Sequence, residues 1–407
     1  MAEIQPFRGI FYDVAGEDLA RVLAPPYDVI TPDHQDELHA RDPRNIVRVV
    51  LSRLTGDAAY DDAGRHFRAW QQQGVLKRDA RPALYVLEQT FETPAGARTR
   101  LGLLARFRAE PAETGTILPH EHTRAAAKED RYKLLVATRA NFSPIFMMVA
   151  DETRAFASDL AHAAQAAPAL SITDDGGVGH RLWRVTEPVA LERLRARLAA
   201  ARAYIADGHH RYATALRFAG TPGGTPFTLG YFTPLESEGL LVLPYHRMLS
   251  SGPSLDEARA RLRPAFELHD VQGTREAAEV VARSRAAFAF GLVQPGAGGC
   301  VAEVRPGALA LPADTPACLR ALDTYVLHRA VLGPLLGVGD EAVSYVHSLG
   351  EAEQAVAEDR CRLALLLRAT PPRQIVDVAE ARESMPAKST FFHPKLPSGL
   401  VIHPVDA

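Results

Sequence analysis

The chain has 407 residues, of which 47% are hydrophobic and 23% are charged, and its formal net charge is −3. These values are ordinary for a globular protein of two or three domains, and they give no whole-molecule attraction to nucleic acid. The three cysteines, Cys300, Cys318 and Cys361, are too few and too far apart for a disulfide framework or a zinc knuckle.

The first residues lack the cationic stretch followed by an apolar stretch that marks a secretory leader. No apolar run approaches the roughly 18 residues that a membrane-spanning helix needs. Free cysteine thiols also fit a reducing compartment. We therefore expect a cytoplasmic protein that does not contact a membrane, and the sequence leaves a homodimer open.

A rigid loop near the N-terminus is the first candidate binding element. Pro25 and Pro26 fix the backbone, and Pro26 disfavours a helix at the residue before it. Such a loop can hold Tyr27 and Asp28 in fixed positions, so both are candidate substrate-binding residues. The alternative is an ordinary turn that packs on the core.

Four elements are predicted between this loop and the middle of the chain. Residues 43–51, with basic residues at their start, predict a strand, and residues 58–74 carry large apolar side chains at helical spacing. Residues 83–90 and 99–108 each predict a strand. A Thr-Pro-Ala-Gly turn separates them, so together they predict a β-hairpin.

The second candidate binding element begins at His120. His120 and Glu121 precede a predicted helix on which Lys128 and Arg131 share one face. The His-Glu-His spacing puts no two histidines one helical turn apart, so it differs from the HExxH zinc motif. We expect a polar loop that enters a cleft, with Glu121 as a base or metal ligand, His120 near substrate, and both cations near phosphate. The alternative is a solvated, charged helix.

The densest polar stretch directly follows a predicted apolar strand. Gly208 can adopt a positive φ or let a ligand approach the backbone, and Asp207 occupies the position of a helix cap. The N-terminus of the next helix, together with Arg211, suits a phosphate group. His209 and His210 add titratable groups. The alternative, a common turn before a solvated helical turn, is weakened by four ionisable residues in five.

The C-terminal part predicts further strands and helices. Residues 238–249 are apolar on both faces, which predicts a central strand. His246 and Arg247 lie near the end of this strand and are candidate substrate-binding residues; the alternative is a surface pair. Residues 315–332 predict a helix, which Pro334 and the glycine before it should end.

The last part of the chain combines polar and aromatic residues. Lys388 and Lys395 lie close to several hydroxyl and imidazole side chains, which suits phosphate binding. A disordered basic tail is the alternative, but Phe391 and Phe392 argue against it. We expect the tail to fold back on the cleft.

Several enzyme classes lack their motifs. The chain has neither a Walker GxxxxGK[ST] stretch nor a GxGxxG stretch, which argues against a P-loop kinase and a Rossmann dehydrogenase. No convincing helix-turn-helix is present, so nucleic acid is disfavoured as a partner. The first cysteine of the chain is Cys300, far from the Asp207 stretch, which argues against thiol-based redox chemistry there.

Six strings together resemble one protein family. Asp207-Gly208-His209-His210-Arg211-Tyr212 resembles the signature of the ParB/sulfiredoxin superfamily. The whole set is similar to the family called domain of unknown function 1015. The other five strings are Ala24-Pro25-Pro26-Tyr27-Asp28-Val29-Ile30, Leu118-Pro119-His120-Glu121-His122-Thr123, Lys128-Glu129-Asp130-Arg131-Tyr132-Lys133-Leu134-Leu135, Ala140-Asn141-Phe142-Ser143-Pro144-Ile145-Phe146 and His393-Pro394-Lys395-Leu396-Pro397-Ser398-Gly399-Leu400-Val401.

This resemblance implies an α/β fold (mixed α+β) with a ParB/sulfiredoxin-like core and additional mixed-sheet lobes. The core is expected to surround the Asp207 corner, in which residues 207–211 connect a strand to a helix. We expect three regions. Residues 1–150 form an N-terminal α/β region with the proline loop and the His-Glu-His segment, and residues 151–250 form the ParB-like core. Residues 251–407 form a C-terminal α/β lobe whose tail returns to the cleft.

Some relatives are free L-serine kinases that use pyrophosphate or ADP. The resemblance therefore implies a phosphotransferase that acts on a small hydroxyl substrate, most simply free L-serine, with pyrophosphate or ADP/ATP as donor and Mg²⁺ as cofactor. Asp207, Glu121, His209 and His210 are the catalytic candidates, and the two carboxylates are also the metal candidates. The alternatives are a ParB-like nucleotide- or nucleic-acid-binding module and a phosphohydrolase. From the residues alone we infer only an anion-binding acid/base site.

Overall fold

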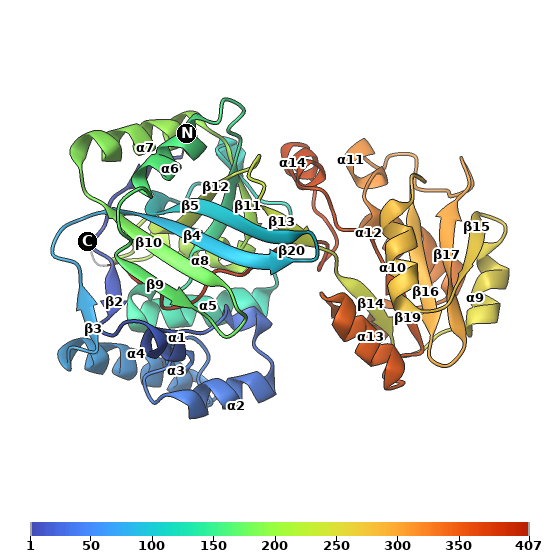
Figure 1. The fold of residues 1–407 in the computed structure, drawn as a ribbon, viewed down its shortest axis with the longest axis horizontal. Helices are drawn as coiled ribbons and strands as arrows, with labels where there is room; N and C mark the ends of the chain where they lie inside the picture. Colours follow the sequence, from blue (N-terminus) through green and yellow to red (C-terminus); the bar gives the residue numbers. More distant parts are fainter. Residues whose placement is uncertain (1, 406–407) are drawn as a thin grey trace. The chain divides into compact units, whose positions relative to one another are not determined.

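The computed structural model describes residues 2–405, which divide into two units. Residues 2–119, 123–241 and 394–405 belong to the first unit, and residues 120–122 and 242–393 belong to the second. Both units combine helices with sheets, so the expected mixed α/β class is confirmed (Figure 1). Within residues 2–405, no helix has both the length and the apolar character that crossing a bilayer requires.

A nine-stranded mixed sheet forms the framework of the first unit (Figure 1). Its order is β6-β11-β8-β12-β5-β4-β10-β9, and β1 pairs with β5. Strands from both of the expected regions 1–150 and 151–250 belong to this one sheet. The strands are β1 (Ile4–Gln5), β4 (Leu84–Thr93), β5 (Gly96–Arg108), β6 (Ile117–Leu118), β8 (Ile145–Val149), β9 (Leu170–Thr173), β10 (Gly179–Val185), β11 (Ala203–Asp207) and β12 (Phe227–Pro234).

Most pairs in this sheet are antiparallel, including the predicted β4–β5 hairpin. The parallel pairs are β11 with β6 and β12 with β8. Strand β11 lies between β6 and β8 and ends at Asp207. Strand β6 pairs with Ala203 and Tyr204 only, so Asp207 is held by pairing on one side, opposite Phe146 of β8.

Helices cover this sheet. Phe156 of α6 and Leu194 of α7 share a buried cluster with Leu103 and Phe107 of β5, and Tyr212 of α8 stacks on Phe107 with ring centroids 6.2 Å apart. The predicted helix 58–74 is confirmed as α4. The helices of this unit are α1 (Glu17–Val22), η1 (Tyr27–Val29), α2 (Pro32–Arg41), α3 (Val47–Val50), α4 (Asp57–Gln72), η2 (Ala112–Thr114), α5 (Ala125–Thr138), α6 (Ala155–Ala163), α7 (Pro188–Ala200) and α8 (His209–Ala219).

The end of the chain is built into the first unit. Strand β21 (His403–Pro404) pairs with β7 (Ala140–Asn141), and β2 (Ile10–Tyr12) pairs with β3 (Leu76–Arg78). A bridge between Ile10 and Ile402 joins these two small sheets. The described end of the tail is thus folded, as its aromatic and apolar residues suggested.

Buried His403 makes one pH-dependent prediction. Its Nδ1 lies 2.8 Å from Asn141 Oδ1, and burial lowers the pKa of His403 to about 3. In the unfolded chain the imidazole of this histidine takes up a proton near pH 6.5, whereas the buried imidazole stays neutral. The folded state is therefore most stable, relative to the unfolded state, above that pH. Stability then falls by about 1.4 kcal/mol per pH unit until the folded-state pKa is reached.

We therefore expect the unfolding free energy of His403→Gln to decline less steeply between pH 6 and 4 than that of the wild type. Urea unfolding at pH 7, 6, 5 and 4 measures the slope. His162→Gln, at an exposed position of α6, is the control. Equal slopes for His403→Gln and the wild type would contradict the prediction.

A six-stranded antiparallel sheet forms the framework of the second unit, in the order β15-β17-β16-β19-β14-β18. Buried clusters on its faces include Leu249 and Phe290 on one side and Met248 and Val301 on the other. The strands are β14 (His246–Leu249), β15 (Phe266–Val271), β16 (Ala289–Gln294), β17 (Gly298–Val304), β18 (Val343–Val346) and β19 (Leu363–Leu366), with a separate pair β13 (Leu241–Leu243) and β20 (Phe391–His393).

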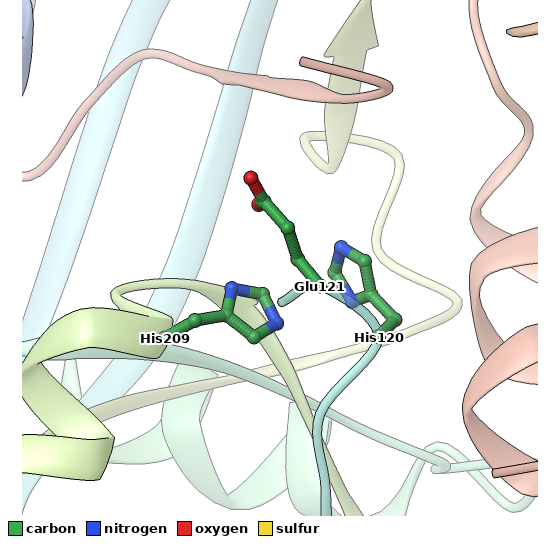
Figure 2. A group of neighbouring side chains, drawn as sticks. All are labelled: His120, Glu121 and His209. Carbon is green, nitrogen blue, oxygen red and sulfur yellow. The ribbon is translucent and has the colours of Figure 1, made fainter. Parts of the chain in front are cut away.

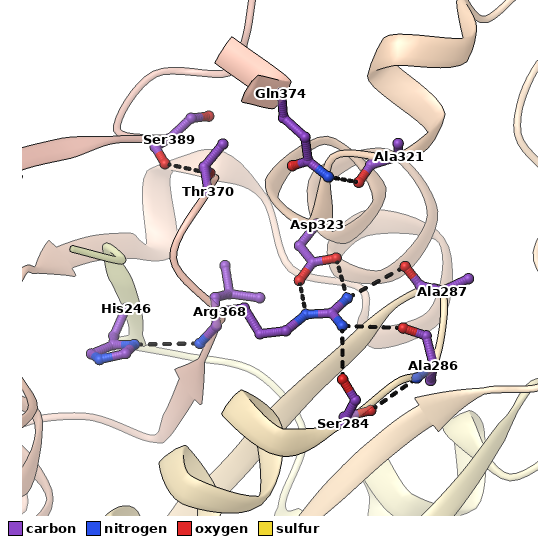
Figure 3. A network of polar contacts seen from close by, with 11 residues as sticks. His246, Ser284, Ala286, Ala287, Ala321, Asp323, Arg368, Thr370, Gln374 and Ser389 are labelled. Atoms are coloured by element: carbon purple, nitrogen blue, oxygen red, sulfur yellow. Dashed lines mark hydrogen bonds and ion pairs between the residues drawn. The ribbon is translucent and has the colours of Figure 1, made fainter. Parts of the chain in front are cut away.

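An ion pair joins several segments of this unit (Figure 3). Arg368, after β19, donates from Nε and Nη2 to the two carboxylate oxygens of Asp323 at 2.7 and 2.8 Å, and from Nη1 to the carbonyls of Ser284 and Ala286. The helices of this unit are α9 (Leu255–Leu262), α10 (Thr274–Arg283), α11 (Ala317–Arg320), α12 (Asp323–Val326), η3 (Leu327–Leu336), η4 (Asp340–Ala342), α13 (Leu349–Ala357) and α14 (Pro372–Glu380).

The predicted strand at residues 43–51 is wrong, because the short helix α3 occupies this place. Asn45 explains the difference. Its Oδ1 accepts from Val47 N at 2.9 Å, and its Nδ2 donates to the carbonyls of Arg21 and Leu23. These contacts fix a helical turn, and two of them come from a distant segment.

Two predictions in the C-terminal part also need correction. The single strand expected at residues 238–249 is two strands, β13 and β14, because Pro244 lies between them and has no N–H for a sheet. The helix expected to stop before Pro334 is instead three short helices. The last of these, η3, is a π-helix that contains Pro334 and ends at Leu336.

Candidate functional site

The Asp207 corner has the predicted strand, turn and helix. Strand β11 ends at Asp207, helix α8 begins at His209, and Gly208 between them has a φ of +99°. A Cβ at Gly208 would lie 3.0 Å from the Arg211 guanidinium. Glycine therefore permits both the left-handed turn and the return of the Arg211 side chain over it.

Asp207 forms ion pairs and does not cap the helix. Lys395 Nζ donates to its Oδ1 at 2.5 Å, and Arg211 forms an ion pair with its Oδ2. The expected cap is wrong, because Gly208 is the N-cap residue and no side chain accepts from the first turn of α8. Burial raises the pKa of Asp207, but Lys395 and Arg211 outweigh burial and hold it well below its usual range.

Both cations are fixed by contacts outside the corner. Arg211 also donates to the carbonyl of Pro144, just before β8. The backbone of the tail is held on the sheet: Gln89 Nε2 donates to Lys395 O at 3.1 Å, and Arg100 Nη2 donates to Pro394 O at 2.6 Å. The cations are therefore positioned by the sheet and not only by Asp207.

His210 connects α8 with the start of α5. Arg124, the N-cap residue of α5, donates its backbone N–H to His210 Nε2 at 3.0 Å, and no side chain caps α5. Burial lowers the pKa of His210, and Arg124 lowers it further, while Asp28 raises it. At neutral pH the imidazole is thus uncharged, with Nε2 as acceptor and the proton on Nδ1.

Lys128 and Arg131 lie on α5, and their surroundings differ. The Lys128 carbonyl accepts from Thr214 of α8 at 3.3 Å, and its ammonium forms no ion pair among residues 2–405. Arg131 is engaged: its guanidinium lies 3.9 Å from the centre of the Tyr27 ring, and Nη1 donates to Val50 O at 2.9 Å. Lys128 is therefore free to meet a ligand, whereas Arg131 positions Tyr27.

The proline loop places Tyr27 and Asp28 in the short helix η1. Burial raises the pKa of Tyr27 to about 12, so its hydroxyl keeps its proton at neutral pH. Asp28 is exposed and has neither an ion pair nor a hydrogen bond among the described residues. Its charge acts on the pKa of both Tyr27 and His210, which places this free carboxylate near them.

A cavity of about 50 Å³ lies in the first unit, with Tyr27, Arg131 and Arg211 in its wall. Ser143 and Thr214 add hydroxyl groups to the same wall. This volume holds a few water molecules but no nucleotide. It gives water a place beside both guanidinium groups.

The structure brings ten of the predicted site residues into the first unit. These are Tyr27, Asp28, Lys128, Arg131, Asp207, Gly208, His209, His210, Arg211 and Lys395. The other five, His120, Glu121, His246, Arg247 and Lys388, belong to the second unit. Figure 2 shows His209 at the start of α8 and His120 and Glu121 on the segment after β6.

Within the second unit, the segment 120–122 runs beside Met385. Met385 N donates to His120 O at 2.8 Å, and Glu121 forms a parallel bridge with Met385. His120 is buried, whereas Glu121 is half-buried. His246 is buried in β14, where its Nδ1 accepts from Leu367 N at 3.3 Å, and burial lowers its pKa to about 4. His246 is therefore neutral at pH 7.

Sequence reasoning missed several residues that position the site. Arg124 was not singled out, although it precedes α5 and holds His210. Gln89 and Arg100 lie in the hairpin and hold the tail. The Pro144 carbonyl, which binds Arg211, belongs to one of the strings that carry the family resemblance. That string was the one available signal, since the others need knowledge of distant contacts.

Asp207 in this arrangement does not fit the expected role of a Mg²⁺ ligand. Mg²⁺ prefers carboxylate and water oxygens in near-octahedral geometry. One Asp207 oxygen pairs with Lys395 and the other with Arg211, so a metal ion would have to displace a cation. We therefore assign no reaction step to a metal ion at Asp207.

Residues 4–325 match the family model described as "Protein of unknown function (DUF1015)". A conserved hypothetical protein from Pyrococcus furiosus is 13% identical with a TM-score of 0.35, covering 73% of this chain and 93% of that chain. A free serine kinase in complex with AMP is 15% identical with a TM-score of 0.35, and the match covers 72% of this chain and 86% of that chain. A mutant free serine kinase in complex with ADP is 14% identical with a TM-score of 0.38, and the match covers 72% of this chain and 87% of that chain. No curated protein matches.

Proposed function

This chain belongs to the DUF1015 family of unknown function, whose model spans residues 4–325, and we propose that it is a phosphotransferase. The proposed reaction transfers a phosphoryl group from pyrophosphate, ADP or ATP to the hydroxyl of a small molecule. The acceptor we propose is free L-serine, on the strength of the motif resemblance described above. Asp207 is proposed to position two cations and not to act as the base.

One observation carries this proposal: two helix N-termini without side-chain caps meet beside several cations. The His210–Arg124 hydrogen bond joins the start of α8 to the start of α5. Free N–H groups at such ends favour an anion. Arg211, Lys395 and the unpaired Lys128 add positive charge from three different segments. Catalysis of phosphoryl transfer depends mainly on such fixed positive charge.

Asp28 is the proposed proton acceptor. Its carboxylate is exposed and unpaired among residues 2–405, in contrast to Asp207, whose ion pairs keep its pKa too low for a base at neutral pH. In the proposed step, the acceptor hydroxyl attacks phosphorus, the bond to the donor's leaving oxygen breaks, and Asp28 takes the hydroxyl proton. Neutral His210 can donate a hydrogen bond from Nδ1.

Phosphorus NMR of the purified protein with L-serine and MgCl₂ tests the reaction. Pyrophosphate, ADP and ATP are offered in separate tubes. We expect a phosphoserine signal from at least one donor. Release of inorganic phosphate alone would replace transfer by hydrolysis, and no turnover of any donor would overturn the proposal.

Lys128 and Lys133 provide a matched pair of variants on α5. Lys128→Met should lower kcat/KM about tenfold or more, because an unpaired ammonium beside the anion site is lost. Lys133→Met should leave kcat/KM unchanged, because Lys133 pairs with exposed Asp57. Steady-state rates for the two variants check this, and equal losses would argue against the placement of the donor beside Lys128.

A further inference from the structure

A buried arginine without an acidic partner marks the second unit. Arg247, in β14, has no exposed surface. Its Nη1 donates to Tyr245 O at 2.5 Å and its Nη2 to Lys388 O at 3.3 Å, while its Nε has no acceptor among residues 2–405. No carboxylate in that range forms an ion pair with it. A buried charge without a counter-charge is costly, so a partner outside the chain is indicated.

A second cation lies in the same group of contacts. Lys388 Nζ is 3.3 Å from Tyr245 Oη, and this ammonium also has no ion pair among the described residues. Its backbone φ of +59° lies in the left-handed region, which costs a non-glycine residue free energy and occurs often at functional sites. Ser389 holds the segment in place through a 2.9 Å hydrogen bond with Thr324.

Neutral hydrogen-bonding groups lie near Arg247. The ring of Tyr345 is 5.3 Å from the Arg247 guanidinium. His328, on the π-helix η3, places Nδ1 3.2 Å from Asp340, and its buried Nε2 has no partner among residues 2–405. Burial lowers the pKa of His328, and Arg247 lowers it further, so it is neutral. Asp340 itself is 88% exposed and contacts His328 instead of Arg247. π-Helical turns are frequent at functional sites.

We propose that the second unit binds a phosphate group through Lys388 and Arg247, either as inorganic phosphate or on a small phosphomonoester. Two fixed positive charges match the charge of about −1.5 to −2 that such a group carries at pH 7, whereas a monocarboxylate would leave one charge unbalanced. Lys388 and Tyr345 are half-buried and can be reached from solvent. This site goes beyond the proposed transfer reaction and does not depend on it.

Equilibrium dialysis of the full chain against radiolabelled inorganic phosphate tests the proposal. Lys388→Gly removes the ammonium and suits a φ of +59°, so the variant should fold. Arg382→Gly is the matched control, because exposed Arg382 has a φ of +57° and lies six residues earlier in the same unit. We expect Lys388→Gly to bind one phosphate per chain fewer than the wild type, and Arg382→Gly to bind the same number. Equal numbers for all three proteins would overturn the proposal.

A second variant and competing ligands sharpen the test. Arg247→Lys keeps the charge but loses the planar fork, and it should weaken the same class of sites at least tenfold. Displacement of the labelled phosphate by glycerol 3-phosphate supports a phosphomonoester as the ligand. Retention of the labelled phosphate in the presence of glycerol 3-phosphate supports inorganic phosphate as the ligand. Displacement by acetate at equal concentration would overturn the charge match on which the proposal rests.

Discussion

Arg211→Lys is expected to lower kcat/KM for phosphoryl transfer about a hundredfold, which corresponds to about 2.7 kcal/mol of transition-state stabilisation. The guanidinium of Arg211 forms an ion pair with Asp207 and also binds the Pro144 carbonyl. A lysine keeps one charge but cannot hold both partners with a planar fork. The remaining ammonium therefore loses its fixed position beside the proposed site of the donor phosphate.

Arg217→Lys is the control for this measurement. Arg217 lies on the same helix, but it forms an ion pair with exposed Glu129 and lies over the Tyr132 ring. Its replacement should leave kcat/KM within about twofold of the wild type. If both variants lose activity equally, the loss reports on the helix and not on anion binding by Arg211.

Asp207→Asn is expected to lower the unfolding free energy by about 3–5 kcal/mol at pH 7. The substitution leaves Arg211 and Lys395 close together without the carboxylate that neutralises them. Asp57→Asn, at an exposed ion pair with Lys133, should cost less than about 1 kcal/mol. Urea unfolding of the two variants and the wild type provides the comparison.

The pH dependence of this loss follows from the lowered pKa of Asp207. A carboxylate whose pKa is depressed on folding stabilises the folded state above its unfolded pKa, which is near 4. The stabilisation is lost as the pH falls below that value. The difference in unfolding free energy between Asp207→Asn and the wild type should therefore be large at pH 7 and shrink below about pH 4. A difference that stays constant down to pH 3 would show that the ion pairs are not its source.

Local sequence patterns were enough to predict the Asp207 corner as a strand, a glycine turn and a helix. The apolar run before Asp207, the glycine after it and the helical spacing from His209 are all short-range signals. The hairpin formed by β4 and β5 was predicted for the same reason. Such elements depend on neighbouring residues, so a single sequence contains the information.

The errors arose where a distant segment decides the outcome. Asp207 was expected to cap α8, but Lys395, 188 residues away, and Arg211 take both of its oxygens. The turn at α3 depends on contacts from Asn45 to residues 21–23. No local pattern reveals such partners. The sequence also could not show that Asp28 is unpaired while Asp207 is not, although this difference reverses their proposed roles.

The anchoring of Lys395 has a consequence for synthesis of the chain. Lys395 O accepts from Gln89, 306 residues earlier, and its ammonium pairs with Asp207. During translation, the nine-stranded sheet can pair long before this lysine leaves the ribosome. Until then the Asp207 corner lacks one of its cations, so a chain truncated before Lys395 lacks part of the proposed anion site. Under the proposed function, donor binding would therefore begin only after synthesis has passed residue 395.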